Sequence, residues 1–191
     1  MPKLWNETIE EHRRAVREAV LKVTAALVAE HGLRGVTMSR IAEGTGIGRA
    51  TLYKYFPDVE SIMTAWHERQ IADHLHELAA LGDRPGSAGE RLTAVLDAYA
   101  FIQRRRHGHD AEIGAVLHRG DHVAHAEKHL RTFVSDLLAE GVAAGEVRDD
   151  VAPDELAAYC MHALAAAAGL TSEAAVRRLV QVTVDGLRPS R

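Results

Sequence analysis

The stretch from Thr37 to Phe56, TMSRIAEGTGIGRATLYKYF, restricts the fold more than any other part of the chain. It opens on a threonine, a common helix N-cap, and Ile41 and Ala42 then supply the buried side of a short helix. The glycines of the following GTG sequence end this helix, because glycine adopts the left-handed backbone that a tight turn between helices needs. A second short helix is expected from Arg49 to Tyr55. Two short helices joined by a glycine turn are typical of a helix-turn-helix.

The second short helix is expected to have an apolar side and a polar, basic side. Leu52 and Phe56 turn inward, where they pack against the preceding helices. Gly48 occupies the N-cap position and offers no side chain to cap the helix. The outer surface consists of Arg49, Ala50, Thr51, Tyr53, Lys54 and Tyr55.

With these residues the chain resembles the TetR family of repressors, whose recognition helix ends in a TLYxYF-like sequence; TLYKYF stands here at residues 51–56. The resemblance covers the first third of the chain, up to Trp66. It implies a helix-turn-helix DNA-binding domain over residues 1–57 and a ligand-binding and dimerisation domain over residues 58–191. It also implies a homodimeric repressor that binds a palindromic operator on double-stranded DNA and is released by a small-molecule effector.

Three residues at the start of the second short helix are placed to contact base edges. Arg49 can pair its planar fork with O6 and N7 of guanine in the major groove. Ala50 is small enough to admit the helix and can touch a thymine methyl group, and Thr51 can bind a base or a phosphate. The first turn of this helix is therefore predicted to carry sequence specificity.

Phosphate contacts are predicted around these base contacts. Tyr53 and Lys54 match family positions that grip the DNA backbone, and Thr37 can add a contact at the start of the first short helix. Tyr55 is either a DNA contact or a partly buried core aromatic. The charge distribution agrees, since the net charge of −4 divides into +3 through Phe56 and −7 for the remainder.

The composition favours an all-α fold. Alanine is abundant and aromatic residues make up only 5%, which favours helices over sheets. Cys160 is the only cysteine, so no internal disulfide forms and a reducing compartment is expected. The N-terminus lacks an apolar signal core, and no run approaches the length of a membrane span. We therefore expect a cytoplasmic protein with no membrane partner.

The first helix is predicted to begin at a capping box formed by Thr8 and Glu11 and to end at Gly32. It is expected to support the two short helices. Solvated surface charge is the simpler interpretation of three arginines near its start, although they can reach phosphates: Arg13, Arg14 and Arg17.

Six further helices are predicted, over about residues 58–81, 92–103, 113–117, 121–145, 153–170 and 172–187. The last two are apolar over much of their surfaces, which indicates either an intramolecular core or a four-helix interface in a homodimer. The resemblance implies the homodimer. Large side chains expected on inward faces are the candidates for an effector pocket: Trp66, Tyr99, Ile102, Leu117, Phe133, Leu137 and Tyr159.

Histidine is frequent, with 12 in 191 residues. His122, His125 and His129 share one face of a predicted helix, so a metal-responsive DNA-binding regulator is an alternative function. No cluster of cysteines or carboxylates accompanies them in the sequence, and polar surface groups are the simpler interpretation.

The sequences that partly resemble enzyme motifs do not match those motifs in full. The sequence GTGIG follows a helix and lacks the third glycine of a dinucleotide loop, and neither His-Glu pair continues to the second histidine of HExxH. We therefore expect no enzyme activity, no catalytic residues and no cofactor. A helical enzyme or protein-interaction module without a DNA role is the alternative from a different class.

Overall fold

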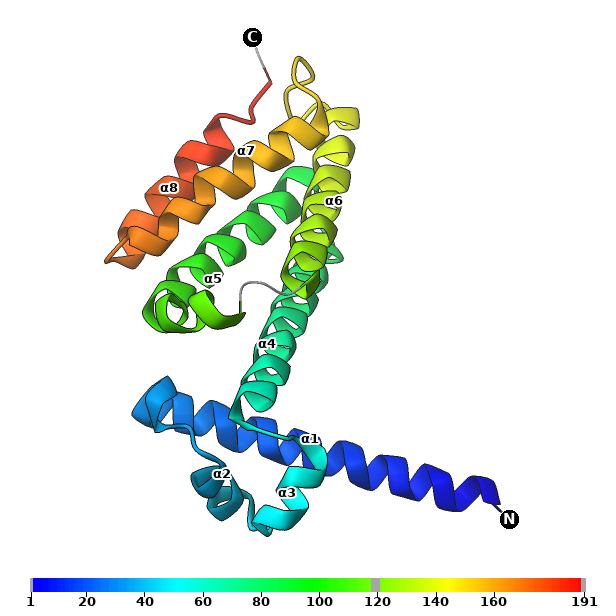
Figure 1. Ribbon diagram of the computed structural model, residues 1–191. Helices are drawn as coiled ribbons and strands as arrows, with labels where there is room; N and C mark the ends of the chain where they lie inside the picture. The colour runs from blue at the N-terminus through cyan, green and yellow to red at the C-terminus, as the bar shows by residue number, and fades with distance from the viewer. Residues whose placement is uncertain (1, 118–120, 190–191) are drawn as a thin grey trace. The chain divides into compact units, whose positions relative to one another are not determined.

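The computed structural model describes residues 2–117 and 121–189, together with the side chains of residues 9–105 and 123–189. Within these ranges the regular structure is entirely helical, which confirms the predicted all-α fold (Figure 1). The helices are α1 (Pro2–His31), α2 (Met38–Thr45), α3 (Arg49–Tyr55), α4 (Val59–Gly82), α5 (Ala88–Leu117), α6 (Asp121–Ala143), α7 (Pro153–Ala165) and α8 (Glu173–Asp185), with 3₁₀ turns at Leu33–Gly35 and Ala166–Gly169. No described helix combines the length and the apolarity that a membrane crossing needs.

The chain forms two compact units, Met1–Gln70 and Ile71–Arg191. The division lies inside α4, so the first part of that helix belongs to the first unit. Asp58 caps α4, because its Oδ1 accepts a hydrogen bond from the Ser61 amide at 2.7 Å. The domain boundary expected after residue 57 lies between α3 and α4, whereas the two compact units divide later, after Gln70. The boundary after residue 57 therefore stays a prediction.

The core of the first unit forms on one face of α1. Val20, Thr24 and Val28 are buried there, and α2 packs against α1 with Ile41 buried. The hydroxyl of Thr24 donates to the carbonyl oxygen of Val20 at 2.8 Å, so this buried polar group is satisfied. Leu52 of α3, which packs against α2, is also buried. α2 is therefore held on α1, and α3 is held on α2.

α1 begins earlier than the sequence predicts. The helix is already formed at Pro2, so Thr8 and Glu11 lie inside it rather than at its start. Proline is favourable at the first helical position, because its fixed φ suits the helix and its missing N–H would have no partner there. The predicted capping box is therefore wrong, and α1 carries an additional N-terminal segment.

α5 is the central helix of the second unit. It packs against α6, α7, α8 and the 3₁₀ turn that follows α7 (Figure 1). The sequence predicts two helices here, but α5 continues without a break from Ala88 to Leu117. Arginine is a good helix former, and each of the two glycines in this stretch costs only about 1 kcal/mol relative to alanine. These residues therefore do not end the helix.

The second unit has an apolar core to which α7 contributes Cys160. This residue is fully buried, and burial raises the pKa of its thiol to about 12. The thiol therefore stays protonated at neutral pH and acts as a packing group. α7 ends at Ala165, earlier than predicted, and the chain continues as a 3₁₀ turn to Gly169.

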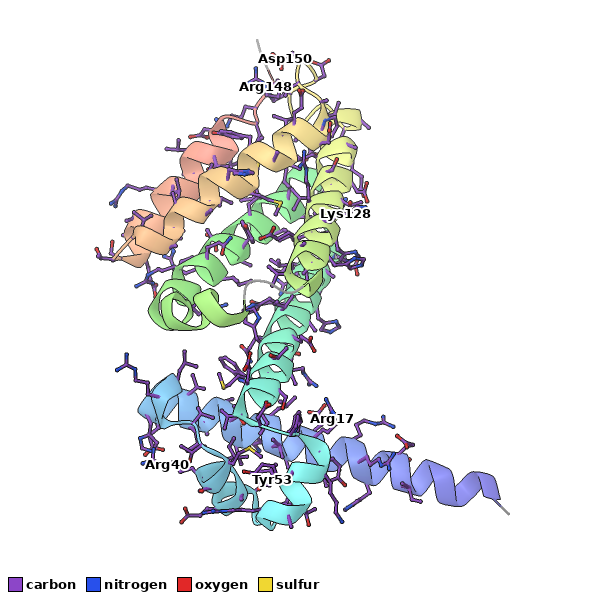
Figure 2. All side chains as sticks on the ribbon, in the orientation of Figure 1. Arg17, Arg40, Tyr53, Lys128, Arg148 and Asp150 are labelled. Atoms are coloured by element: carbon purple, nitrogen blue, oxygen red, sulfur yellow. The ribbon has the colours of Figure 1, made fainter. Side chains whose placement is uncertain are left out.

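Arg148 ties the loop after α6 to the end of α8. Its Nε and Nη2 donate to the two carboxylate oxygens of Asp150, each at 2.7 Å (Figure 2). These bonds lower the pKa of the Asp150 carboxyl below its usual value. Arg148 also donates from Nη1 to the carbonyl oxygen of Gly186 at 3.2 Å, so the carboxyl end of α8 is fixed to this loop.

Candidate nucleic-acid interface

Local hydrogen bonds and close packing fix α2 and the turn after it. Thr37 caps α2, because its Oγ1 accepts a hydrogen bond from the Arg40 amide at 3.3 Å. Gly46 ends α2 with a φ of 69°. Gly44 lies close to α1, since a Cβ atom at this position would be 2.7 Å from Cγ1 of Val23. Gly44 therefore allows α2 to pack closely against α1, and Gly46 allows the turn that leads to α3.

The two glycines on either side of this turn are expected to respond differently to substitution. Gly46→Ala places a side chain at a positive φ and should destabilise the protein by about 1–2 kcal/mol. Gly48 caps α3 with a φ of −60°, and nothing lies within 4 Å of an added Cβ atom. Gly48→Ser should therefore stabilise the protein by about 0.3–1 kcal/mol through a new N-cap. Urea unfolding of both variants checks this, and an equal effect of the two would contradict it.

α3 has the predicted bounds and the predicted two-sided character. Leu52 is 0% exposed and Phe56 is 2% exposed, whereas Tyr53 is 52% exposed (Figure 2). Tyr55 is half-buried. The other predicted DNA contacts are also exposed, namely Thr37 before α2 and Arg49, Ala50, Thr51 and Lys54 on α3. A rigid helix thus presents a polar surface that is held from behind by two buried side chains.

The N-terminal half of α1 brings three arginines close to α3, although the sequence favoured solvated surface charge as their role. They share a groove of about 850 Å³ with α3, lined by Glu10, Arg13, Arg14, Arg17, Thr51, Lys54 and Tyr55. The guanidinium of Arg17 lies over the ring of Phe56, 4.7 Å from its centroid (Figure 2). The spacing of Arg13 and Arg17 could have predicted this position, because it places them on the same helix face as the buried Val20.

Only some of the candidates for an effector pocket lie in the core of the second unit. Tyr99, Ile102 and Leu137 are buried in the core of the second unit, and Phe133 packs against that core. The side chain of Leu117 lies outside the described residues. Trp66 belongs to the first unit, and its indole Nε1 is buried without a hydrogen-bond partner among the described residues.

Tyr159 is not an inward-facing residue, which corrects its choice as a pocket candidate. Its side chain is 46% exposed, because Leu156, Cys160 and Leu164 occupy the buried positions of α7. Tyr159 lies instead beside the end of α8, where its hydroxyl oxygen would be 3.3 Å from a Cβ atom added to Gly186.

The histidine face of α6 is only partly described. His125 and His129 are exposed, whereas the side chain of His122 lies outside the described residues. Where side chains are described, no three histidine, cysteine, aspartate or glutamate residues come together as metal ligands.

Curated proteins similar to this chain include bacterial transcriptional regulators. An uncharacterised HTH-type transcriptional regulator of Mycobacterium tuberculosis is 32% identical over 65% of this chain. The aligned region spans 61% of that protein's own length. The HTH-type transcriptional repressor KstR2 of Mycolicibacterium smegmatis is 29% identical over 72% of this chain and 70% of its own length.

Similarity to solved structures and to family models extends over both units. The crystal structure of a TetR/AcrR-family regulator from Thermobifida fusca covers 90% of this chain and 98% of its own, with a TM-score of 0.76 and 24% identity, and so shares the fold. The model of bacterial regulatory proteins of the tetR family matches residues 20–65, and that of the SbtR-like regulator C-terminal domain matches residues 98–189. The chain therefore belongs to the TetR family of transcriptional regulators.

Proposed function

We propose that this chain is a homodimeric repressor that binds a palindromic operator and is released by a small-molecule effector. The observation that carries the proposal is the two-sided character of α3, whose polar residues are exposed while Leu52 and Phe56 are buried. A helix anchored in this way can enter the major groove without unfolding any part of the core. The curated relative KstR2 is itself described as a repressor, which supports this direction of control.

The proposed contacts divide into base contacts and phosphate contacts. Arg49, Ala50 and Thr51 occupy the first turn of α3 and contact base edges. Tyr53 and Lys54 follow on the same helix and bind the phosphate backbone. As the helix cap, the Thr37 hydroxyl oxygen accepts a hydrogen bond from the Arg40 amide. Its hydroxyl proton can still be donated, and the contact proposed for Thr37 is a hydrogen bond from this hydroxyl to a phosphate oxygen. Tyr55, half-buried, combines packing with a contact at the edge of the interface.

Arg49→Ala is expected to weaken operator binding by about 1–3 kcal/mol and to relax specificity at one base pair. The matched comparison is Lys54→Ala on the same helix, which should weaken binding by a similar factor on every sequence and reduce the salt dependence. Titration of each variant against an operator and its single-base variants measures both effects. A loss from Arg49→Ala that is equal on all sequences would make Arg49 a phosphate contact instead.

The dimer is proposed to form through α7 and α8. These helices pack against each other, and they expose large apolar side chains at Tyr159 and Val182. A two-fold axis that pairs the same two helices of each subunit forms a four-helix interface and presents two copies of α3 to a palindrome.

The effector is proposed to bind within the second unit, near Tyr99, Ile102, Phe133 and Leu137, with Leu117 as a further candidate. A ligand releases the operator only if it favours a dimer geometry in which the two α3 helices no longer fit successive major grooves, roughly 34–36 Å apart. A pocket lined mainly by apolar side chains suits an effector with a substantial apolar part.

Binding to DNA that flanks the protein's own gene tests the proposal as a whole. We expect saturable binding of a dimer to a palindromic site, with weaker binding to scrambled duplexes. A thermal-shift screen of metabolites would then supply candidates that stabilise the protein and release the operator. A monomer that ignores double-stranded DNA at low salt would refute the proposed function.

A further inference from the structure

The groove between α1 and α3 carries an unusual concentration of positive charge. Four of its described lining residues are basic, and Glu10 is the single acid among them. The groove has a volume of about 850 Å³, which is room for a chain of anionic groups. The basic residues come from both walls, with Arg13, Arg14 and Arg17 on α1 and Lys54 on α3.

The position of the arginines follows from the helical repeat of α1. Arg13, Arg17, Val20 and Thr24 follow one another at spacings of four, three and four residues, so they lie on one face of the helix. Val20 and Thr24 are buried in the core of the first unit. The same face therefore changes from buried to basic toward the N-terminus, where α1 passes the exposed side of α3.

Among the described side chains, few pair with the positive charges of the groove. Arg14 and Lys54 form no ion pair or hydrogen bond with any described side chain. Arg13 pairs with Glu10 at 3.1 Å, but both side chains are largely exposed, and such a pair is worth little in water. Arg17 is oriented by the ring of Phe56 and keeps its N–H donors, because a cation–π contact uses only the face of the guanidinium.

We infer that this groove binds the phosphodiester backbone of DNA beside the operator half-site, with Arg13 and Arg14 as additional phosphate contacts. The inference rests on the proposed entry of α3 into the major groove. One of the strands that border the major groove must then pass along α3, where Thr51 and Lys54 line the groove from one side and the α1 arginines from the other. Multiple arginine forks facing a backbone are suited to phosphate oxygens.

The bound strand supplies charge but no sequence information in this groove. Each phosphate that a cation neutralises steepens the dependence of log K on log salt by about 0.9. Loss of two such contacts should lower the slope by about 1.8, so that binding by the variant falls about tenfold less than that of the wild type when salt rises from 50 to 200 mM.

The full-length double variant Arg13→Ala/Arg14→Ala tests the inference. We expect weaker binding by the same factor on operator and scrambled duplexes, together with the lower salt slope. The double variant Arg13→Lys/Arg14→Lys keeps the charges and should retain most of the salt slope. Lys22→Ala is the matched control, since Lys22 is exposed on α1 and is not among the residues that line the groove; it should bind as the wild type does.

Shortening the DNA provides the second arm of the test. Removing base pairs outside the palindrome should weaken binding by the wild type more than binding by the double variant, which has already lost the Arg13 and Arg14 contacts. Wild-type affinity and salt slope in the double variant on long DNA would overturn the inference while leaving the proposed function intact. A wild type that binds no duplex would overturn both, and a loss confined to one base pair would overturn the assignment to phosphates.

Discussion

Leu52→Ala is expected to reduce the free energy of unfolding of residues 1–70 by about 2–5 kcal/mol, which is the usual cost of truncating a large buried aliphatic side chain. Leu52 has no exposed surface, and it lies in the middle of a helix of seven residues. Such a short helix has little stability of its own, because forming its first turn is unfavourable. The side chains of Leu52 and Phe56 therefore decide whether α3 is formed at all.

Operator binding should fall with the loss of stability, because the polar surface of α3 depends on that anchor. Tyr53→Ala is the matched variant on the same helix. Tyr53 is 52% exposed, so its removal should leave unfolding almost unchanged while weakening DNA binding. Urea unfolding and operator titration of the two variants separate folding from contact. Wild-type stability in Leu52→Ala would show that the burial of this residue does not hold α3 in place.

The helix-turn-helix could be predicted from sequence because its signals are local. Thr37 is a cap, Gly46 needs a positive φ, and Pro57 follows the end of α3, so each boundary depends on a few neighbouring residues. The inward positions of Leu52 and Phe56 follow from helical periodicity. The same periodicity also identified the exposed residues of α3, because the positions of a short helix that do not face the core face solvent.

Features that depend on packing between distant segments were missed. The arginines of α1 look like surface charge in sequence, and only the packing of α1 beside α3 brings Arg14 and Lys54 to one groove. α5 was expected to end before its arginines and to be followed by a shorter helix, but it is one helix that packs against α6, α7 and α8. Tyr159 looks like a core aromatic on an apolar helix, although smaller and narrower side chains fill the inward face of α7.

The exposure of Tyr159 gives it a different proposed role in the dimer. Tyr159 on α7 lies beside the end of α8, since a Cβ atom added at Gly186 would lie 3.3 Å from its hydroxyl oxygen, and Val182 is an exposed residue of α8. The Val182 side chain is 66% exposed, which is costly for a large apolar group in a monomer. A partner subunit that covers both residues removes this cost and uses an aromatic anchor of the kind common at interfaces.

Val182→Asp is therefore expected to dissociate the dimer and to weaken binding to a palindromic operator by about 10²–10⁴-fold, the usual gain from linking two binding modules. The substitution is repeated in both subunits of a symmetric dimer, so each interface acquires two unpaired carboxylates. Because Val182 is exposed within the subunit, unfolding of the subunit itself should change little.

Ala139→Asp is the matched control, because Ala139 is an exposed residue of α6 and the substitution adds the same charge. Sedimentation equilibrium gives the oligomeric state, and titration against the full palindrome and a single half-site gives the affinity. The wild type should prefer the palindrome strongly, whereas Val182→Asp should bind both duplexes with the weak affinity of one α3. If Val182→Asp stays dimeric with undiminished operator binding, then the subunits pair through a surface other than α7 and α8. If it becomes monomeric yet keeps the affinity for the palindrome, then recognition needs only one subunit, and the symmetric arrangement of two α3 helices is wrong.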